Sequence, residues 1–302
     1  MLETILPEEM KALEADFMAA CAVPSVLLME RAASAVIEAV SRRTDAHSRV
    51  LFLCGPGNNG GDGYAAARLW AERGGRAVVW ELSDHARGDA DLNRRLLLLA
   101  GISPLTLDGA LPVLPDGTAL IVDALFGTGL SRPLQGMARL LAQSVNASNL
   151  PVIAVDIPSG LNGTTGEDLG DALRATETVT FHRIKQGLVL RDGAAVCGKL
   201  TCTPILLPAS YGHYTGLTLL TAEDAARMRP PRPVNAHKGT FGRVVLLVGS
   251  FGMAGAAALC ANACLRAGAG LVTVACRASI VPTVQTLAPC ATCLPLPEQD
   301  GM

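Results

Sequence analysis

Short apolar runs alternate with longer mixed segments along the first two thirds of the chain. The runs are RVLFLCG from residue 49, RAVVWEL from 76, ALIVDAL from 119, PVIAVDIP from 151 and ETVTFH from 177. They are apolar throughout, without polar alternation, which is typical of strands covered on both faces. The intervals between most of them suit crossover helices. The pattern therefore predicts an α/β fold, a three-layer Rossmann-like arrangement around a mostly parallel sheet.

Other patterns flank these runs and divide the chain. Apolar residues recur at helical spacing over residues 8–20 and 24–42. Near residue 208 the chain becomes rich in Pro and Gly, and a second series begins with RVVLLVG at 243 and LVTVAC at 271. We therefore expect a first domain over residues 1–215 and a second, incomplete α/β domain over 216–302. Within the second, residues 244–264 carry no charge, but their glycines predict a strand, a loop and a packed helix rather than a membrane span.

The charge balance and the cysteines narrow the classes of partner. The chain carries 25 basic and 27 acidic residues without long blocks of either sign, so we expect no nucleic acid and no membrane as partner, and favour a small molecule. Nine scattered cysteines predict reduced thiols, with neither a disulfide framework nor a zinc site. The acidic N-terminus lacks the features of a signal peptide. Together these features predict a cytoplasmic protein.

Polar residues gather at the ends of three predicted strands, at the edge where open α/β sheets bind ligands. The first run leads into GPGNNGGDG, residues 55–63, which predicts either an anion site at a helix start or a tight structural turn. Asp123 ends the third run, before the loop of residues 127–133. Asp156 and Ser159 follow the fourth run in DIPSG. Each acid could instead cap a helix or a turn, but three such ends together predict one site.

The oxygen-bearing side chains at these ends suggest a cation. Asn59, Asp123 and Ser159 offer an amide, a carboxylate and a hydroxyl oxygen, a set that suits a hard ion. With only one carboxylate in the set, a monovalent ion is favoured.

Two other function classes stay open on these residues. Residues 55–60 spell G-x-G-x-x-G, and Glu81 follows where a ribose-binding acid of an NAD(P)-dependent oxidoreductase would stand. That fingerprint, however, has no use for the two asparagines or for DIPSG. The second alternative is a non-catalytic nucleotide-binding module on the same fold. Such a module would be expected to lose its site acids, yet Asp62, Asp123 and Asp156 are all present.

Several segments together resemble a known family. CGPGNNGGDGYAAARLW, VDALFGTGLSRP, AVDIPSGLNGTTG and FHRIKQGLVL, which begin at residues 54, 122, 154 and 181, are similar to the signatures of the NAD(P)H-hydrate epimerase domain. Residues 237–275 resemble the start of the ADP-dependent NAD(P)H-hydrate dehydratase domain, which has a ribokinase-like α/β fold. The two domains are fused in bifunctional enzymes of nicotinamide nucleotide repair. The resemblance covers nearly the whole chain.

The resemblance implies metabolite repair, in which the R and S forms of hydrated NADH and NADPH (NADHX and NADPHX) are epimerised at C6 of the nicotinamide ring. It implies a potassium ion held by Asn59, Asp123 and Ser159, a homodimer, and ADP or ATP only for a complete dehydratase domain. Asp156 and Asp62 are the candidates for proton transfer, with Asp156 as first choice. The substrate-binding residues that it implies are Asn58, Asn59, Gly60, Gly61, Asp62, Gly127, Thr128, Gly129, Leu130, Ser131, Arg132, Pro133 and Asp156.

The sequence also departs from the family pattern. Residues 203–206, Thr-Pro-Ile-Leu, stand where the epimerase pattern continues into Asp-Ile-Gly, which affects the expected end of the first domain. The ADP-binding segment and the Gly-rich loop of the dehydratase family lie further along than Met302. Residues 249–255 would form only one wall of that site. We therefore predict no dehydratase activity for this sequence, and unpaired strand edges in its second domain.

Overall fold

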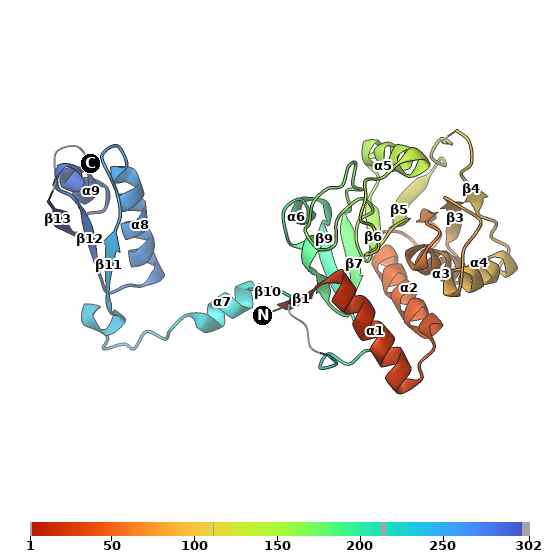
Figure 1. Ribbon diagram of the computed structural model, residues 1–302, viewed down its shortest axis with the longest axis horizontal. Coiled ribbons are helices and arrows are strands. Elements are labelled where there is room, and N and C mark those ends of the chain that lie inside the picture. Colours follow the sequence, from red (N-terminus) through yellow and green to blue (C-terminus); the bar gives the residue numbers. More distant parts are fainter. Residues whose placement is uncertain (1, 111, 213–215, 298–302) are drawn as a thin grey trace. The chain divides into compact units, whose positions relative to one another are not determined.

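The computed structural model describes all residues except 1, 111, 213–215 and 298–302. The chain divides into two compact units, Met1–Ala225 and Ala226–Met302 (Figure 1). The boundary expected after residue 215 adjoins residues outside the described part. Each unit has its own sheet and its own hydrophobic core.

A seven-stranded sheet forms the centre of the first unit, in the order β4-β3-β2-β5-β6-β7-β9. Every neighbouring pair is parallel, which confirms the fold class expected from the apolar runs. The chain winds outward in both directions from β2 and β5, so the topological switch point lies between these two strands. The strands are β2 (Arg49–Cys54), β3 (Arg76–Glu81), β4 (Leu105–Thr106), β5 (Thr118–Ala124), β6 (Val152–Val155), β7 (Glu177–Phe181) and β9 (Lys199–Thr203).

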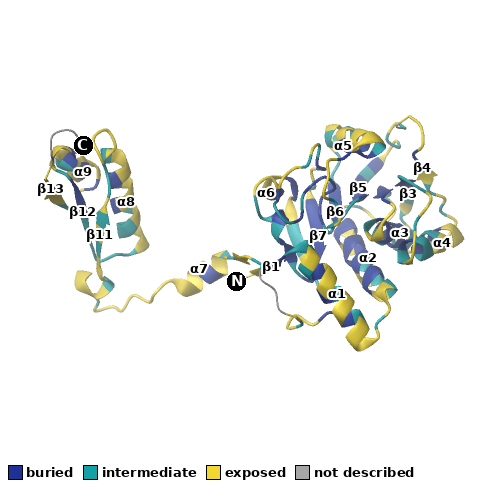
Figure 2. Cartoon of the chain, in the orientation of Figure 1, coloured by how far each residue is buried: buried dark blue, intermediate teal, exposed yellow. Residues whose placement is uncertain are grey.

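Both faces of this sheet are covered. One core joins the sheet to α1, α2 and α3, and a second core joins the opposite face to α5. After Arg49, strand β2 is apolar on both faces because Val50 and Phe52 enter the first core while Leu51 and Leu53 enter the second. Figure 2 shows the strands β5, β6 and β7 as mainly buried. The helices are α1 (Pro7–Cys21), α2 (Ser25–Ser41), α3 (Asn58–Glu72), α4 (Asp89–Leu99), α5 (Gly136–Ser148), η1 (Gln186–Leu188) and α6 (Gly193–Val196).

A small additional sheet joins three distant segments and was not predicted. Strand β1 (Leu2–Ile5) pairs in parallel with β8 (Ile184–Lys185) and antiparallel with β10 (Thr218–Leu219). Strands of two residues carry no periodic pattern, which is why the sequence gives no signal for them. The pairing brings the N-terminal segment beside Lys185, with Ile5 opposite it in the register.

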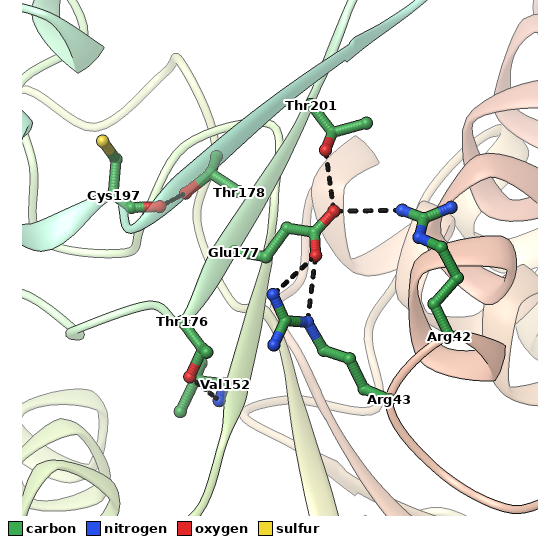
Figure 3. A network of polar contacts seen from close by, with 8 residues as sticks. All are labelled: Arg42, Arg43, Val152, Thr176, Glu177, Thr178, Cys197 and Thr201. Atoms are coloured by element: carbon green, nitrogen blue, oxygen red, sulfur yellow. Dashed lines mark hydrogen bonds and ion pairs between the residues drawn. The ribbon is translucent and has the colours of Figure 1, made fainter.

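A buried carboxylate ties α2 to the sheet at the amino end of β7 (Figure 3). Glu177 accepts hydrogen bonds from Arg42 Nη2 at 3.0 Å, Arg43 Nε at 2.9 Å and Thr201 Oγ1 at 2.7 Å. Burial alone would raise the pKa of Glu177, but these hydrogen bonds outweigh it and lower the pKa below its ordinary value. This network lies at the opposite end of the strands from the predicted site. We therefore assign it to the stability of the fold and not to ligand binding.

The second unit is built on a three-stranded parallel sheet, in the order β11-β12-β13. The charge-free segment forms β11 and α8, as its glycines predict, and no described helix is long and apolar enough to cross a membrane. Strand β13 was not predicted. The elements from α7 onward are α7 (Ala222–Met228), η2 (Lys238–Phe241), β11 (Arg243–Leu247), α8 (Ala254–Ala267), β12 (Leu271–Arg277), η3 (Ala278–Ile280), α9 (Val281–Leu287) and β13 (Thr292–Leu296).

One face of the three-stranded sheet of the second unit is exposed. Helices α8 and α9 share a core with one face of the sheet, while Val245 and Leu247 of β11 are 68% and 75% exposed. Parallel sheets are usually covered on both faces, so these side chains mark an unpartnered apolar face.

All nine cysteines of the chain are free thiols, including Cys290 and Cys293, which stand at C-x-x-C spacing.

Candidate active site

The turn from β2 into α3 is built on close approaches of the backbone. A Cβ atom on Gly55 would lie 1.7 Å from the carbonyl oxygen of Leu125, and one on Gly60 would lie 1.8 Å from the carbonyl oxygen of Gly55. Only glycine fits such contacts. Gly57, the N-cap of α3, has no atom within 4 Å of its Cβ position. Packing therefore explains Gly55 and Gly60, and the space in front of α3 begins at Gly57.

The carboxylate of Asp123 at the end of β5 is completely buried and contacts Ser159. Its Oδ1 accepts a hydrogen bond from the Ser159 hydroxyl at 2.6 Å, and its Oδ2 accepts one from the Ser159 backbone N–H at 2.8 Å. Burial raises the pKa of Asp123 to about 6, although these hydrogen bonds and one from the Leu125 N–H act in the opposite direction. Two of the predicted strand ends are thus directly joined.

Asp156 is placed by the turn after β6. Its backbone adopts the left-handed region with φ 64°, which is uncommon for a residue other than glycine. Its Oδ1 lies 2.6 Å from Lys185 Nζ and accepts a hydrogen bond from Thr180 Oγ1 at 3.0 Å. The Lys185 side chain is only 2% exposed and also donates to the Phe181 carbonyl oxygen at 3.0 Å. A buried lysine therefore fixes the Asp156 carboxylate.

The β2–α3 turn, the loop after β5, Asp156 and helix α1 line a cavity of about 630 Å³. Gly60 and Gly61 lie outside its lining, since Gly60 packs on Gly55 and Gly61 packs on Met29. Asp123 and Ser159 lie beneath the lining rather than in it. The remaining residues expected to bind substrate do line the cavity: Asn58, Asn59, Asp62, Gly127, Thr128, Gly129, Leu130, Ser131, Arg132, Pro133 and Asp156.

Three acids and one lysine in this lining influence one another electrostatically. Burial raises the pKa of Asp62 well above its ordinary value, and the charges of Asp156 and Glu14 add to this while Lys185 opposes it. Burial raises the pKa of Glu14 to about 7, with Lys185 lowering it and Asp156 raising it. Burial thus favours the neutral form of Asp62, which lines the same cavity as the ion pair of Asp156 and Lys185.

Two of these groups, Lys185 and Glu14, were not predicted from the sequence. Lys185 lies in FHRIKQGLVL, a segment used only to identify the resemblance, and Glu14 lies in the amphipathic pattern of the first helix. Neither stands at the end of a predicted strand, so the strand-end rule could not find them. The signal available for Lys185 was its place in the segment directly after the fifth apolar run.

Of the three residues expected to bind a cation, Asp123 and Ser159 are in direct contact, and Asn59 and Ser159 both lie next to the loop of Phe126 and Gly127. Asn59 Oδ1 lies 3.1 Å from the Cβ position of Gly127, and the neighbouring Phe126 N–H donates to Ser159 Oγ at 2.9 Å. Asp123 receives its hydrogen bonds from Ser159 and Leu125, which carry no charge. The donor set therefore fits a monovalent cation. Among the described residues, no three or more His, Cys, Asp or Glu side chains form a group that could hold a metal ion, and the predicted set contains only one such side chain, that of Asp123.

Glu81 does not have the surroundings of a ribose-binding acid. It is completely buried and accepts hydrogen bonds from Tyr64 at 2.9 Å, from Arg94 at 2.8 and 2.7 Å, and from Thr106 at 2.9 Å. Burial alone would raise its pKa, but these donors lower it below the ordinary value. Its carboxylate is fully engaged within the protein, which argues against the oxidoreductase reading.

The comparisons with known proteins concern the family and the fold. Residues 25–187 match the family described as YjeF-related protein N-terminus, and residues 244–301 match the one described as NAD(P)H-hydrate dehydratase. Proteins named bifunctional NAD(P)H-hydrate repair enzyme Nnr are similar: 39% identical in Moorella thermoacetica, over 84% of this chain and 50% of that protein. The one from Escherichia coli is 36% identical, over 87% of this chain and 51% of that protein.

The chain spans about half the length of these curated relatives. Among solved structures, the crystal structure of yeast ynu0 is similar with a TM-score of 0.58 and 20% identity, over 74% of this chain and 98% of that one. This likeness supports the fold. Since the first family match covers more than half of the sequence, the chain belongs to the family of YjeF-related protein N-termini.

Proposed function

We propose that the first unit is an NAD(P)H-hydrate epimerase, which interconverts the R and S forms of NADHX and NADPHX. The observation that carries this proposal is the cavity in which Asp62 lies near the ion pair of Asp156 and Lys185. The relatives' printed name, NAD(P)H-hydrate repair enzyme, supplies the substrate class. A volume of about 630 Å³ lies within the usual range of small-molecule sites.

The two loops around the cavity suit a phosphorylated substrate. The amide groups at the start of α3 and the positive end of its dipole favour an anion, and Arg132 adds a guanidinium at the lining. Among described atoms, Asn59 Nδ2 is buried without a hydrogen-bond partner. A buried donor without a partner is costly, so a bound oxygen atom would stabilise it.

The chemistry needs a proton donor and a proton acceptor. The lone pair of the ring nitrogen forms an iminium as the C6–O bond breaks, and the departing hydroxyl takes a proton and leaves as water. Water then adds to the other face of C6 and gives up a proton. In the R to S direction, the protonated Asp62 donates to the leaving hydroxyl, and the Asp156 carboxylate accepts from the entering water. Asp156 remains the first candidate, because Lys185 and Thr180 fix its orientation.

We include in this proposal a potassium ion that is bound beneath the cavity and has a structural role. Asn59, Asp123 and Ser159 would hold it, and its positive charge would favour the ionised form of Asp123. The ion would supply positive charge near the loop that begins at Phe126. Its expected effect is to order this loop.

The second unit and the assembly state form the remaining parts of the proposal. ADP or ATP would serve only a complete dehydratase domain, and we expect these 302 residues to dehydrate no substrate. A homodimer is expected from the family resemblance and can be measured by sedimentation equilibrium.

A chromatographic assay tests the function. Purified protein is mixed with the R epimer of NADPHX, and R, S and NADPH are followed with and without potassium and ADP. Protein-dependent conversion of R to S without NADPH formation supports the proposal. No acceleration above the spontaneous rate would contradict it and favour a non-catalytic binding module. Formation of NADPH with ADP would contradict the expectation for the second unit.

A further inference from the structure

Helix α1 forms one wall of the cavity. Pro7, Met10, Lys11 and Glu14 line the cavity, and all four precede residue 25, where the family match begins. The parallel pairing of β1 with β8 places Ile5 opposite Lys185, and α1 begins two residues later. The same pairing therefore positions both the lysine and the helix that carries Glu14.

The charged groups that are electrostatically linked to Glu14 lie on three other segments of the first unit. Lys185 on β8 and Asp156 after β6 both act on the ionisation of Glu14, and Glu14 acts on that of Asp62 on α3. Lys11 lies one turn earlier on α1 and also lines the cavity. Glu14 is half-buried, so it contacts both the cavity and solvent. It is thus electrostatically linked to the two acids of the proposed reaction.

After one turnover of the proposed reaction, Asp62 and Asp156 have exchanged their protonation states. After one conversion of R to S, Asp62 has lost a proton and Asp156 has gained one. Before the next R epimer can react, a proton must return to Asp62 and another must leave Asp156. An acid–base group of suitable pKa that lines the same cavity can speed both of these proton transfers.

We propose that Glu14 is the proton-exchange residue that resets the cavity after each turnover, an inference that rests on the proposed epimerase function. The Asp156 carboxyl gives its proton to the Glu14 carboxylate, and the Glu14 carboxyl gives a proton to the Asp62 carboxylate. Only O–H bonds form and break, and nothing is oxidised or reduced. The pKa of Glu14, about 7, makes both of its forms available at neutral pH.

The test compares Glu14→Gln with wild type in the full chain, by the R to S assay over a range of pH. We expect kcat to fall at least about tenfold while KM stays close to wild type. The change of kcat with pH near 7 should disappear. Added imidazole, a small soluble proton carrier, should restore kcat in the variant, and Glu14→Asp should restore part of it. The control is Glu8→Gln on the same helix, where Glu8 is exposed and lies outside the cavity lining.

Three outcomes would overturn the inference. An active Glu14→Gln variant with the wild-type kcat and pH profile shows that Glu14 moves no proton. A loss of activity with a raised KM and no response to imidazole assigns Glu14 to substrate binding. Wild-type protein that converts no R epimer overturns the proposed function itself, which separates the two failures. Circular dichroism of each variant verifies that the fold is kept.

Discussion

At the scale of single residues, Asp156 combines backbone strain with a fixed side chain. Its left-handed backbone costs about 1 kcal/mol for a residue with a Cβ atom. The contacts with Lys185 and Thr180 offset this cost. Strain of this kind is concentrated at functional sites, where the surrounding structure holds the residue in place. Asparagine tolerates the same backbone conformation, so the carboxylate can be removed without disturbing the turn.

We expect Asp156→Asn to lower the rate of epimerisation by about 10²-fold or more, because an amide cannot accept the proton of the entering water. The rate is measured by chromatography at saturating R epimer. The control is Asp108→Asn, which changes an exposed acid in a loop. Wild-type activity in Asp156→Asn would show that another group handles the proton.

We expect potassium to stabilise the wild type and not Asp123→Asn, since the ion would pair with the buried carboxylate. At about 10- to 100-fold above its Kd, a bound ion adds about 1.4 to 2.7 kcal/mol. Thermal unfolding in potassium and in tetramethylammonium measures the difference. Because the pKa of Asp123 is raised to about 6, the potassium effect should be full above that pH and fade as the pH falls below it. Equal effects in both proteins would place the ion elsewhere.

At the scale of elements, polar contacts lock helices onto the sheet at positions away from the cavity. Glu177 joins the end of α2 to β7 and β9, and Glu81 joins α3 and α4 to β3 and β4. Both carboxylates are buried and fully hydrogen-bonded, which is the condition for keeping a charge inside a protein. These two networks therefore fix α2, α3 and α4 on the sheet, and α3 is the helix that begins at the cavity.

We expect Glu177→Gln to lower the free energy of unfolding by about 1.5 to 3 kcal/mol at pH 7, the usual loss for a hydrogen bond to a charged group. The folded protein lowers the pKa of Glu177 below 4.5. Its stabilisation is therefore full above the unfolded value and is lost as the pH falls through the folded value. Urea unfolding of wild type, Glu177→Gln and the exposed control Glu38→Gln measures this. A deficit that persists at low pH would indicate lost packing rather than lost charge.

At the scale of the whole molecule, the two units differ in how completely their sheets are covered. The first has cores on both faces of its sheet, whereas the second has a core on one face and exposes Val245 and Leu247 on the other. The proposed epimerase site lies entirely within the first unit. The first unit should therefore fold and act without the second.

We expect a chain that ends at Met228, after α7, to keep the epimerisation rate of the full chain. It should also unfold in one cooperative transition, because both of its cores are retained. Calorimetry and the R to S assay provide the comparison. Loss of folding or activity on truncation would show that residues beyond 228 contribute to the first unit.

The sequence predicted the strands that carry the site because most of their residues are apolar in unbroken runs, a local pattern typical of burial on both faces. It also brought Asp123, Asp156 and Ser159 to one edge, since parallel strands end together. It could not separate the roles of the glycines. Gly55 is needed for a close contact with Leu125 on a neighbouring segment, and such a contact leaves no local pattern.

The sequence by itself determined the α/β class, the parallel strands, the polar strand ends and the family, because these depend on patterns within short segments. Only the tertiary structure decided that Lys185 pairs with Asp156, that Glu14 faces the same cavity and that Glu81 is engaged with Arg94. These contacts join residues from different segments, and the pairing of β1 with β8 joins the start of the chain to the segment after β7. The physical reason is that local periodicity reports which face of an element is buried, whereas side-chain partners are selected only when the elements pack.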